Sequence, residues 1–178
     1  MKPWVMGVLL AVMLLSGCSN TGIPEGLEPV ENLDVQRYLG QWHEIVRLDH
    51  GFEEGLEQVT ATYSLREDGG VKVVNRGYNS ESGEWEEAEG KAYFIEDDTT
   101  GRLKVSFFGP FYGGYNIIEL DEDYQYAMIT GPDRSYFWLL FRSPEPDAER
   151  VEQLVNRADE LGFDTDAFIY PKTRTNSL

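Results

Sequence analysis

Few residues of this sequence have the type and spacing needed for catalysis or metal binding. The two histidines are His43 and His50, and the pair Asp49-His50 would need a distant serine to form a nucleophile and base arrangement. Neither histidine lies in a nucleophile motif or at metal-ligand spacing. A lipid-modifying enzyme is therefore the weaker hypothesis, and haem binding leaves His50 as the candidate axial ligand.

A different chemistry is indicated at Cys18, the single cysteine of the chain. Lys2 and an apolar run at residues 5–15 precede it, and this run is too short to span ~30 Å of hydrocarbon but suits a signal peptide. The segment Leu15-Ser16-Gly17-Cys18 resembles the lipobox of bacterial lipoproteins, in which cleavage precedes the cysteine and the cysteine is acylated. We therefore expect a signal peptide at 1–17 and lipidation of Cys18. An ordinary secretory signal with an incidental cysteine is the alternative.

Composition argues for one acidic domain. The chain has 178 residues, 41% of them hydrophobic, and a formal net charge of −17, which disfavours contact with a phosphate backbone. We expect no nucleic-acid partner and no metal or other cofactor. Residues 18–31, which contain glycine and proline but no apolar periodicity, are predicted to be a lipidated tether, 32–171 the folded domain and 172–178 a polar tail.

The stretch Gly40-Gln41-Trp42 opens the first predicted strand. Gly40 follows a short helical turn at residues 32–39, in which Asp34 is the expected N-cap. From Trp42 onward, alternate residues, Val46 among them, are predicted to face inward. Every later strand can be interpreted as folding back on this one.

Seven further segments show strand periodicity, separated by glycine, proline or aspartate turns. They are residues 58–66, 71–78, 85–95, 103–107, 115–120, 124–130 and 136–142. A helical stripe at 148–161 and a short strand at 168–170 follow. Eight hairpin-linked strands favour an all-β fold, an eight-stranded antiparallel up-and-down β-barrel with one C-terminal α-helix packed outside and a ninth short strand. A two-sheet sandwich is the alternative.

Strand counting assigns the loops to two ends of the barrel. Trp42 and Arg142 collect at a closed end, where the guanidinium is expected to stack on the indole. The loops at 49–57, 79–83, 108–114 and 131–135 surround the opposite end, the mouth. Aromatic residues are concentrated there, and Arg134 is the expected partner for an anionic group. The candidate ligand-binding residues are Val46, Phe107, Phe111, Tyr112, Tyr115, Met128, Arg134, Tyr136 and Trp138.

Three motifs in order resemble those of the lipocalin family. Gly40-Gln41-Trp42 matches the first motif, Asp121 with Tyr124 the second, and Arg142 the third. The resemblance covers residues 34–171 and is strongest to the bacterial outer-membrane lipocalins, relatives of apolipoprotein D. Two features depart from this subgroup, His43 in place of a tyrosine and a looser second motif.

The resemblance implies a function. It implies a lipid-anchored, periplasm-facing protein of the bacterial outer membrane that stores or transports fatty acids or lysophospholipids, with no catalytic activity. Binding of another small hydrophobic ligand and a structural module with a filled barrel are the alternatives. Whether the mouth is open, and whether a homodimer forms, stay open at this point.

Overall fold

Alternating side chains and short turns make residues 40–141 a series of antiparallel strands. The computed structural model describes residues 20–173. Its strands are β1 (Gly40–Leu48), β2 (Leu56–Leu65), β3 (Val71–Asn79), β4 (Glu84–Phe94), β5 (Arg102–Ser106), β6 (Gly113–Leu120), β7 (Tyr126–Thr130), β8 (Phe137–Phe141) and β9 (Phe168–Ile169). Its helices are α1 (Val35–Tyr38), α2 (Ala148–Glu160) and the 3-10 helix η1 (Thr165–Ala167).

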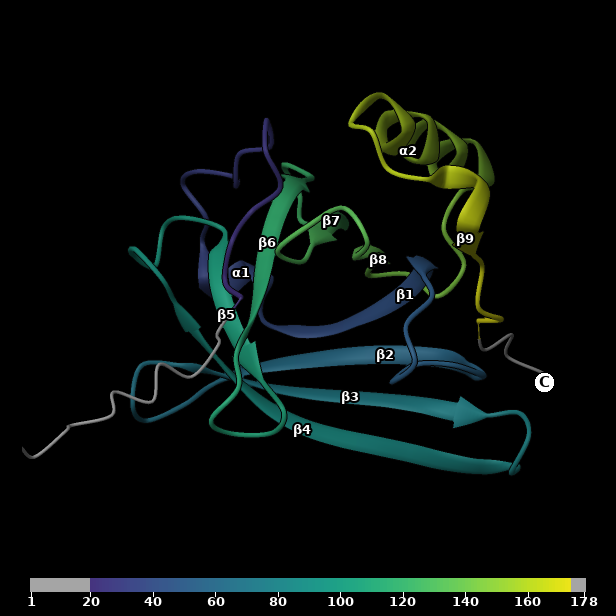
Figure 1. Cartoon of the computed structure of the whole chain (residues 1–178), viewed down its shortest axis with the longest axis horizontal. Coiled ribbons are helices and arrows are strands. Elements are labelled where there is room, and N and C mark those ends of the chain that lie inside the picture. The colour runs from purple at the N-terminus through teal and green to yellow at the C-terminus, as the bar shows by residue number, and fades with distance from the viewer. Residues whose placement is uncertain (1–19, 174–178) are drawn as a thin grey trace, which may run out of the picture.

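The first eight strands close into a barrel. Each of β2 to β7 pairs with the next strand, and β1 pairs with both β2 and β8, so the eight-stranded barrel has no free edge. β9 pairs with the end of β1, and α2 lies outside the barrel (Figure 1). The predicted eight-stranded barrel, external helix and ninth strand are confirmed. None of the helices in residues 20–173 is long and apolar enough to cross a membrane.

A β-bulge in β1 changes which residues face inward. The register to β8 shifts between Glu44 and Val46, and such an extra residue reverses the alternation beyond it. Trp42 is part of the interior core, whereas Ile45 and Val46 belong to the outer core under α2. Arg47 consequently enters the barrel, where 2% of its surface is exposed.

The barrel wall separates two apolar cores. The interior core holds inward side chains such as Ile129 and Leu140, and the outer core lies between α2 and strands β1, β7 and β8. Val46 and Met128 are both in the outer core, so their predicted inward orientation is wrong. For Val46 the cause is the bulge. For Met128 the inward positions of β7 are taken by its neighbours Ala127 and Ile129.

The closed end is built as predicted around Trp42 and Arg142. The guanidinium carbon of Arg142 lies 3.9 Å from the centre of the indole. Its nitrogens donate to the carbonyls of Arg37, Gln41, Tyr38 and Tyr124, at 2.7 to 3.3 Å. These hydrogen bonds join α1, which precedes the barrel, to Arg142, which follows β8.

Four smaller residues in or near the motifs also have structural roles. Gly40 has a φ of +93°, a conformation that glycine adopts without strain. Asp34 caps α1 by accepting from the backbone N–H of Gln36 and Arg37. Asp121 accepts from the N–H groups of Asp123 and Gln125 in the β6–β7 turn, and the Tyr124 hydroxyl accepts from the N–H of Asp34.

The chain before α1 packs along the barrel. The carbonyl of Asn20 accepts from Gly114 N–H at 2.9 Å, and the N–H of Val30 donates to Ile117 at 2.8 Å. Residues 20–30 therefore run beside β6 from its mouth end toward the closed end, as the purple segment of Figure 1 shows. Leu27 and Leu33 are buried. The predicted lipidation site, Cys18, lies outside the described residues.

Candidate functional site

The mouth half of the interior is bounded by Trp138 and Phe107. Both are partly buried and pack against the interior core, as predicted. A Cβ on Gly90 of β4 would lie 2.8 Å from the Phe107 ring, so this glycine allows Phe107 to lie flat against the barrel wall. The two aromatic residues come from β8 and from the end of β5, and they define the entrance to the apolar interior.

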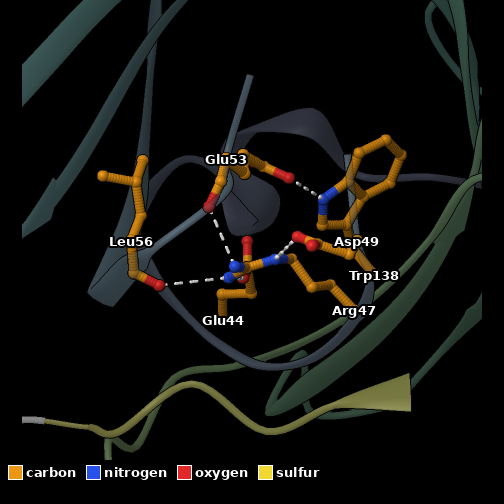
Figure 2. Close-up of polar contacts among 6 residues, drawn as sticks. All are labelled: Glu44, Arg47, Asp49, Glu53, Leu56 and Trp138. Atoms are coloured by element: carbon orange, nitrogen blue, oxygen red, sulfur yellow. Dashed lines mark hydrogen bonds and ion pairs between the residues drawn. The ribbon is translucent and has the colours of Figure 1, made fainter. Parts of the chain in front are cut away.

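A buried guanidinium occupies the centre of this entrance. Arg47 donates from Nη1 to the Glu44 carboxylate at 2.8 Å and to the Leu56 carbonyl at 3.3 Å, and from Nη2 to the Glu53 carbonyl at 2.9 Å. Its Nε lies 3.5 Å from the Asp49 carboxylate. Figure 2 shows these groups converging on Arg47. A buried charge needs such partners, because desolvation is costly.

The β1–β2 loop, residues 49–55, places a second carboxylate in the entrance. Glu53 is 6% exposed, and its carboxylate accepts from Trp138 Nε1 at 3.0 Å (Figure 2). Because Arg47 also holds the Glu53 carbonyl, the loop is fastened across the mouth at both its backbone and its side chain. We call residues 49–55 the lid.

The two buried carboxylates have different partners, Arg47 for Glu44 and Trp138 for Glu53. Burial, and then the neighbouring Glu53 carboxylate, raise the pKa of Glu44 to about 8, although Arg47 opposes the shift. Burial also raises the pKa of Glu53, while its hydrogen bond from Trp138 opposes the rise. The two carboxyl groups together therefore retain a proton near neutral pH.

The free energy of unfolding is expected to fall as the pH rises from about 4.5 to about 8 because of Glu44. In the unfolded chain its carboxyl loses a proton near its ordinary pKa of 4.5, whereas the folded protein holds the proton until about 8. Between these values the folded state binds more protons, so a rise in pH favours unfolding. At ~1.4 kcal/mol per pKa unit, this shift corresponds to a loss of roughly 5 kcal/mol across the range. Urea unfolding of the wild type and Glu44→Gln over this range measures it. Equal slopes for the two proteins would contradict the assignment.

Three tyrosine hydroxyls meet deeper in the barrel. The Tyr115 oxygen lies 2.6 Å from that of Tyr38 and 2.8 Å from that of Tyr63. Burial raises the pKa of all three phenols, so they stay neutral. Beside them is an apolar cavity of about 20 Å³, room for about one water molecule. Tyr115, predicted at the mouth, therefore directs its hydroxyl into the interior, toward Tyr38 of α1 at the closed end.

The remaining predicted residues lie around the mouth or outside it. Tyr136 stacks on His50 with ring centres 4.4 Å apart, and Phe111 is exposed on the β5–β6 loop. Tyr112, predicted as a ligand-binding residue of the mouth, lies on the outer face near Lys104. Arg134 donates to the carbonyls of Leu161 and Glu25. Its predicted role as an anion partner is wrong in this arrangement, because these bonds hold it against α2.

Glu44, Arg47 and Glu53 were missed by the sequence analysis. The charged pair within an apolar strand is a visible signal, since Glu44 and Arg47 interrupt a run of large apolar residues. Alternation without a bulge places Arg47 on the outer face. In the sequence, Glu53 is typical of a polar loop residue. Its burial comes from the conformation of the lid.

Comparison with known proteins decides the family. A model of a lipocalin-like domain matches residues 33–173. The chain belongs to the lipocalin family. Outer membrane lipoprotein Blc of Vibrio cholerae is 52% identical over 164 residues, 92% of this chain and 95% of the relative. The protein of the same name from Escherichia coli K12 is 52% identical over 160 residues, 90% of each chain.

More distant lipocalins agree with the fold. Rat apolipoprotein D is 32% identical over 70% of this chain and 68% of the relative. The structure of insecticyanin from Manduca sexta superposes with a TM-score of 0.67 at 22% identity, covering 86% of this chain and 88% of that one. The outer-membrane localisation predicted for this lipocalin is confirmed by relatives that are 50–52% identical to it and are named outer membrane lipoproteins. It is a binding protein for small hydrophobic molecules and not an enzyme.

Proposed function

We propose that this lipocalin binds fatty acids or lysophospholipids and stores or transports them at the outer membrane, anchored through acylated Cys18. One observation carries the proposal. The apolar interior ends at the mouth in two fixed donors, Arg47 and Trp138, that hold the lid. An acyl chain fits the apolar part, and a carboxylate or phosphate head fits the donors.

Binding requires the lid and the entrance aromatics to move. The cavity of about 20 Å³ is far smaller than the ~300 Å³ or more of typical ligand sites. Withdrawal of Glu53 would free Trp138 Nε1 and Arg47 Nη2 for the head of a ligand. The head of the ligand would then take the place of the Glu53 carboxylate at Trp138 and of the Glu53 backbone carbonyl at Arg47.

Three measurements test the proposal. Lipid extraction of the protein purified from its own membrane, followed by mass spectrometry, is expected to identify an acyl lipid, and intact mass is expected to show acylation of Cys18. Titration with a fluorescent fatty acid should saturate and be competed by palmitate and by lysophospholipid. Absence of bound lipid together with absence of competable binding contradicts the proposal. Competition by cyclic hydrophobic ligands alone would favour another class of small hydrophobic ligand.

Trp138→Ala is expected to weaken acyl-ligand binding about 10- to 30-fold. The substitution removes apolar contact surface at the entrance and the N–H donor, each of which contributes about 1 kcal/mol or more. Trp138→Phe is the matched control, because it keeps a ring and removes only the donor. Its affinity should lie between those of the wild type and Trp138→Ala. Unchanged affinity in Trp138→Ala, measured by the same titration, would place the ligand elsewhere.

A further inference from the structure

The N-terminal end of the described chain lies at the barrel mouth. Asn20 forms a bridge with Gly113 at the start of β6, and the next residues follow the same strand. The Asn116 side chain donates to the Gly22 carbonyl at 3.0 Å and to that of Gly131 at 3.1 Å. Residues 20–22 are thus fixed between the β5–β6 loop and the β7–β8 loop, both of which border the mouth.

This position limits where the anchor can be. Cys18 precedes Asn20 by two residues, and two residues of extended chain span at most ~7 Å. An acyl group on Cys18 is therefore attached beside the mouth and not beside the closed end. The segment that was expected to lift the domain off the bilayer is instead packed along β6, as its hydrogen bonds with Gly114 and Ile117 demonstrate.

The same rim exposes large aromatic side chains. Phe108 is 81% exposed and Phe111 63% exposed on the β5–β6 loop, and Phe52 of the lid is 64% exposed. Residues 107–112 carry no charged side chain. Exposed aromatic residues grouped in this way mark an interaction surface.

None of the hairpin loops at the closed end is free of charged side chains as residues 107–112 are. These three loops contain the acidic sequences Glu67-Asp68, Asp97-Asp98 and Asp121-Glu122-Asp123. Such carboxylates are expensive to bring into a lipid interface, whereas phenylalanine rings enter it favourably. The anchor position and the aromatic rim therefore both indicate that the mouth end of the barrel faces the membrane.

We propose that the lipocalin lies mouth-down, with Phe108 and Phe111 inserted into the interfacial region of the bilayer that holds acylated Cys18. The inference depends on the acylation in the proposed function and adds the orientation. In this orientation an acyl ligand passes between bilayer and barrel interior beneath the lid without crossing open water. The net charge of −17 makes a zwitterionic surface the expected partner, because anionic lipids repel the domain.

The orientation is tested on the acylated mature protein in phosphatidylcholine vesicles. Because Cys18 is the single native cysteine, Phe111→Cys and Asp98→Cys each add one free thiol to an acylated protein, one at each end of the barrel. With the same environment-sensitive dye, nitroxide-labelled lipids should quench most of the fluorescence at position 111 and little at position 98. Equal quenching, or stronger quenching at position 98, overturns the proposal.

A second experiment measures the aromatic contribution without the anchor. In a mature Cys18→Ser protein, Phe108→Ser with Phe111→Ser should lower partitioning into the vesicles about tenfold, the effect of ~1.4 kcal/mol. Leu65→Ser, an exposed apolar residue at the closed end, is the matched control and should leave partitioning unchanged. Equal losses in the two variants would overturn the proposal.

Ligand titration separates this inference from the proposed function. The Phe108→Ser protein, changed at a residue that is not among the candidate ligand-binding residues, should bind the fluorescent fatty acid with wild-type affinity. If it does and the dye at position 98 is the one quenched, the orientation is wrong and lipid binding stands. If the dye at position 111 is shielded before vesicles are added, and light scattering gives twice the monomer mass, the rim binds a second copy and the membrane-facing assignment is overturned.

Discussion

Trp42→Ala is expected to lower the free energy of unfolding by about 3–5 kcal/mol, the range for removing a fully buried large aromatic side chain. Trp42 is 0% exposed. Its Nε1 donates to the Tyr38 carbonyl at 2.8 Å, and its ring supports Arg142, which joins α1, β1 and the β6–β7 turn. Loss of the indole leaves a cavity and removes the surface on which this guanidinium is stacked.

Urea unfolding followed by fluorescence measures the effect. Trp85→Ala is the control, because Trp85 is 42% exposed on the outer face of the β3–β4 hairpin, and it should cost less than about 1 kcal/mol. Trp42→Phe should fall between the two and provides a measurable value if the alanine protein does not fold. A loss for Trp42→Ala no larger than that for Trp85→Ala contradicts a structural role.

Arg47→Met is expected to cost about 3–5 kcal/mol, because removing one partner of a buried ion pair leaves the others unpaired. The carboxylate of Glu44 and the carbonyls of Glu53 and Leu56 each lose a donor. Without the guanidinium the pKa of Glu44 rises further, so stability continues to fall above pH 8, where that of the wild type levels off. Adding Glu44→Gln should recover part of the loss by removing the buried acid.

The matched variant Arg47→Lys keeps the charge without the planar fork. It should retain part of the stability, since one ammonium group cannot serve the three acceptors in the same geometry. Denaturation of the three variants at pH 6 and pH 9 separates charge from hydrogen bonding. A pH-independent cost below about 1 kcal/mol for Arg47→Met would show that the network contributes little and that the lid is held by other contacts.

The closed end was predictable because its determinants are local or repeated. A glycine with positive φ before Trp42, the Asp34 cap and the turn at Asp121 are set by neighbouring residues. The strands follow from two-residue alternation, so their number and order could be counted. Arg142 falls at the end of the last strand, opposite Trp42, once the barrel is closed.

The mouth was predicted less well. Phe107 and Trp138 are inward at the entrance, but Val46 is turned outward by a bulge that has no clear sign in the sequence. The positions of three further side chains depend on which face of the barrel wall, or which neighbouring element, they contact. These residues are Met128, Tyr112 and Arg134. Each misplacement comes from a contact between segments distant in the chain, which alternation within one strand does not specify.

The sequence alone determined the eight-stranded barrel, its sealed base around Trp42 and Arg142, and the membership in the lipocalin family, because periodicity and short motifs encode these directly. Only the tertiary structure decided that Arg47 enters the barrel beside Glu44, that Glu53 closes the mouth on Trp138, and that residues 20–22 lie beside that mouth. The reason is physical. Burial of a charge depends on partners brought together by the closed barrel, and those partners lie on different strands and loops.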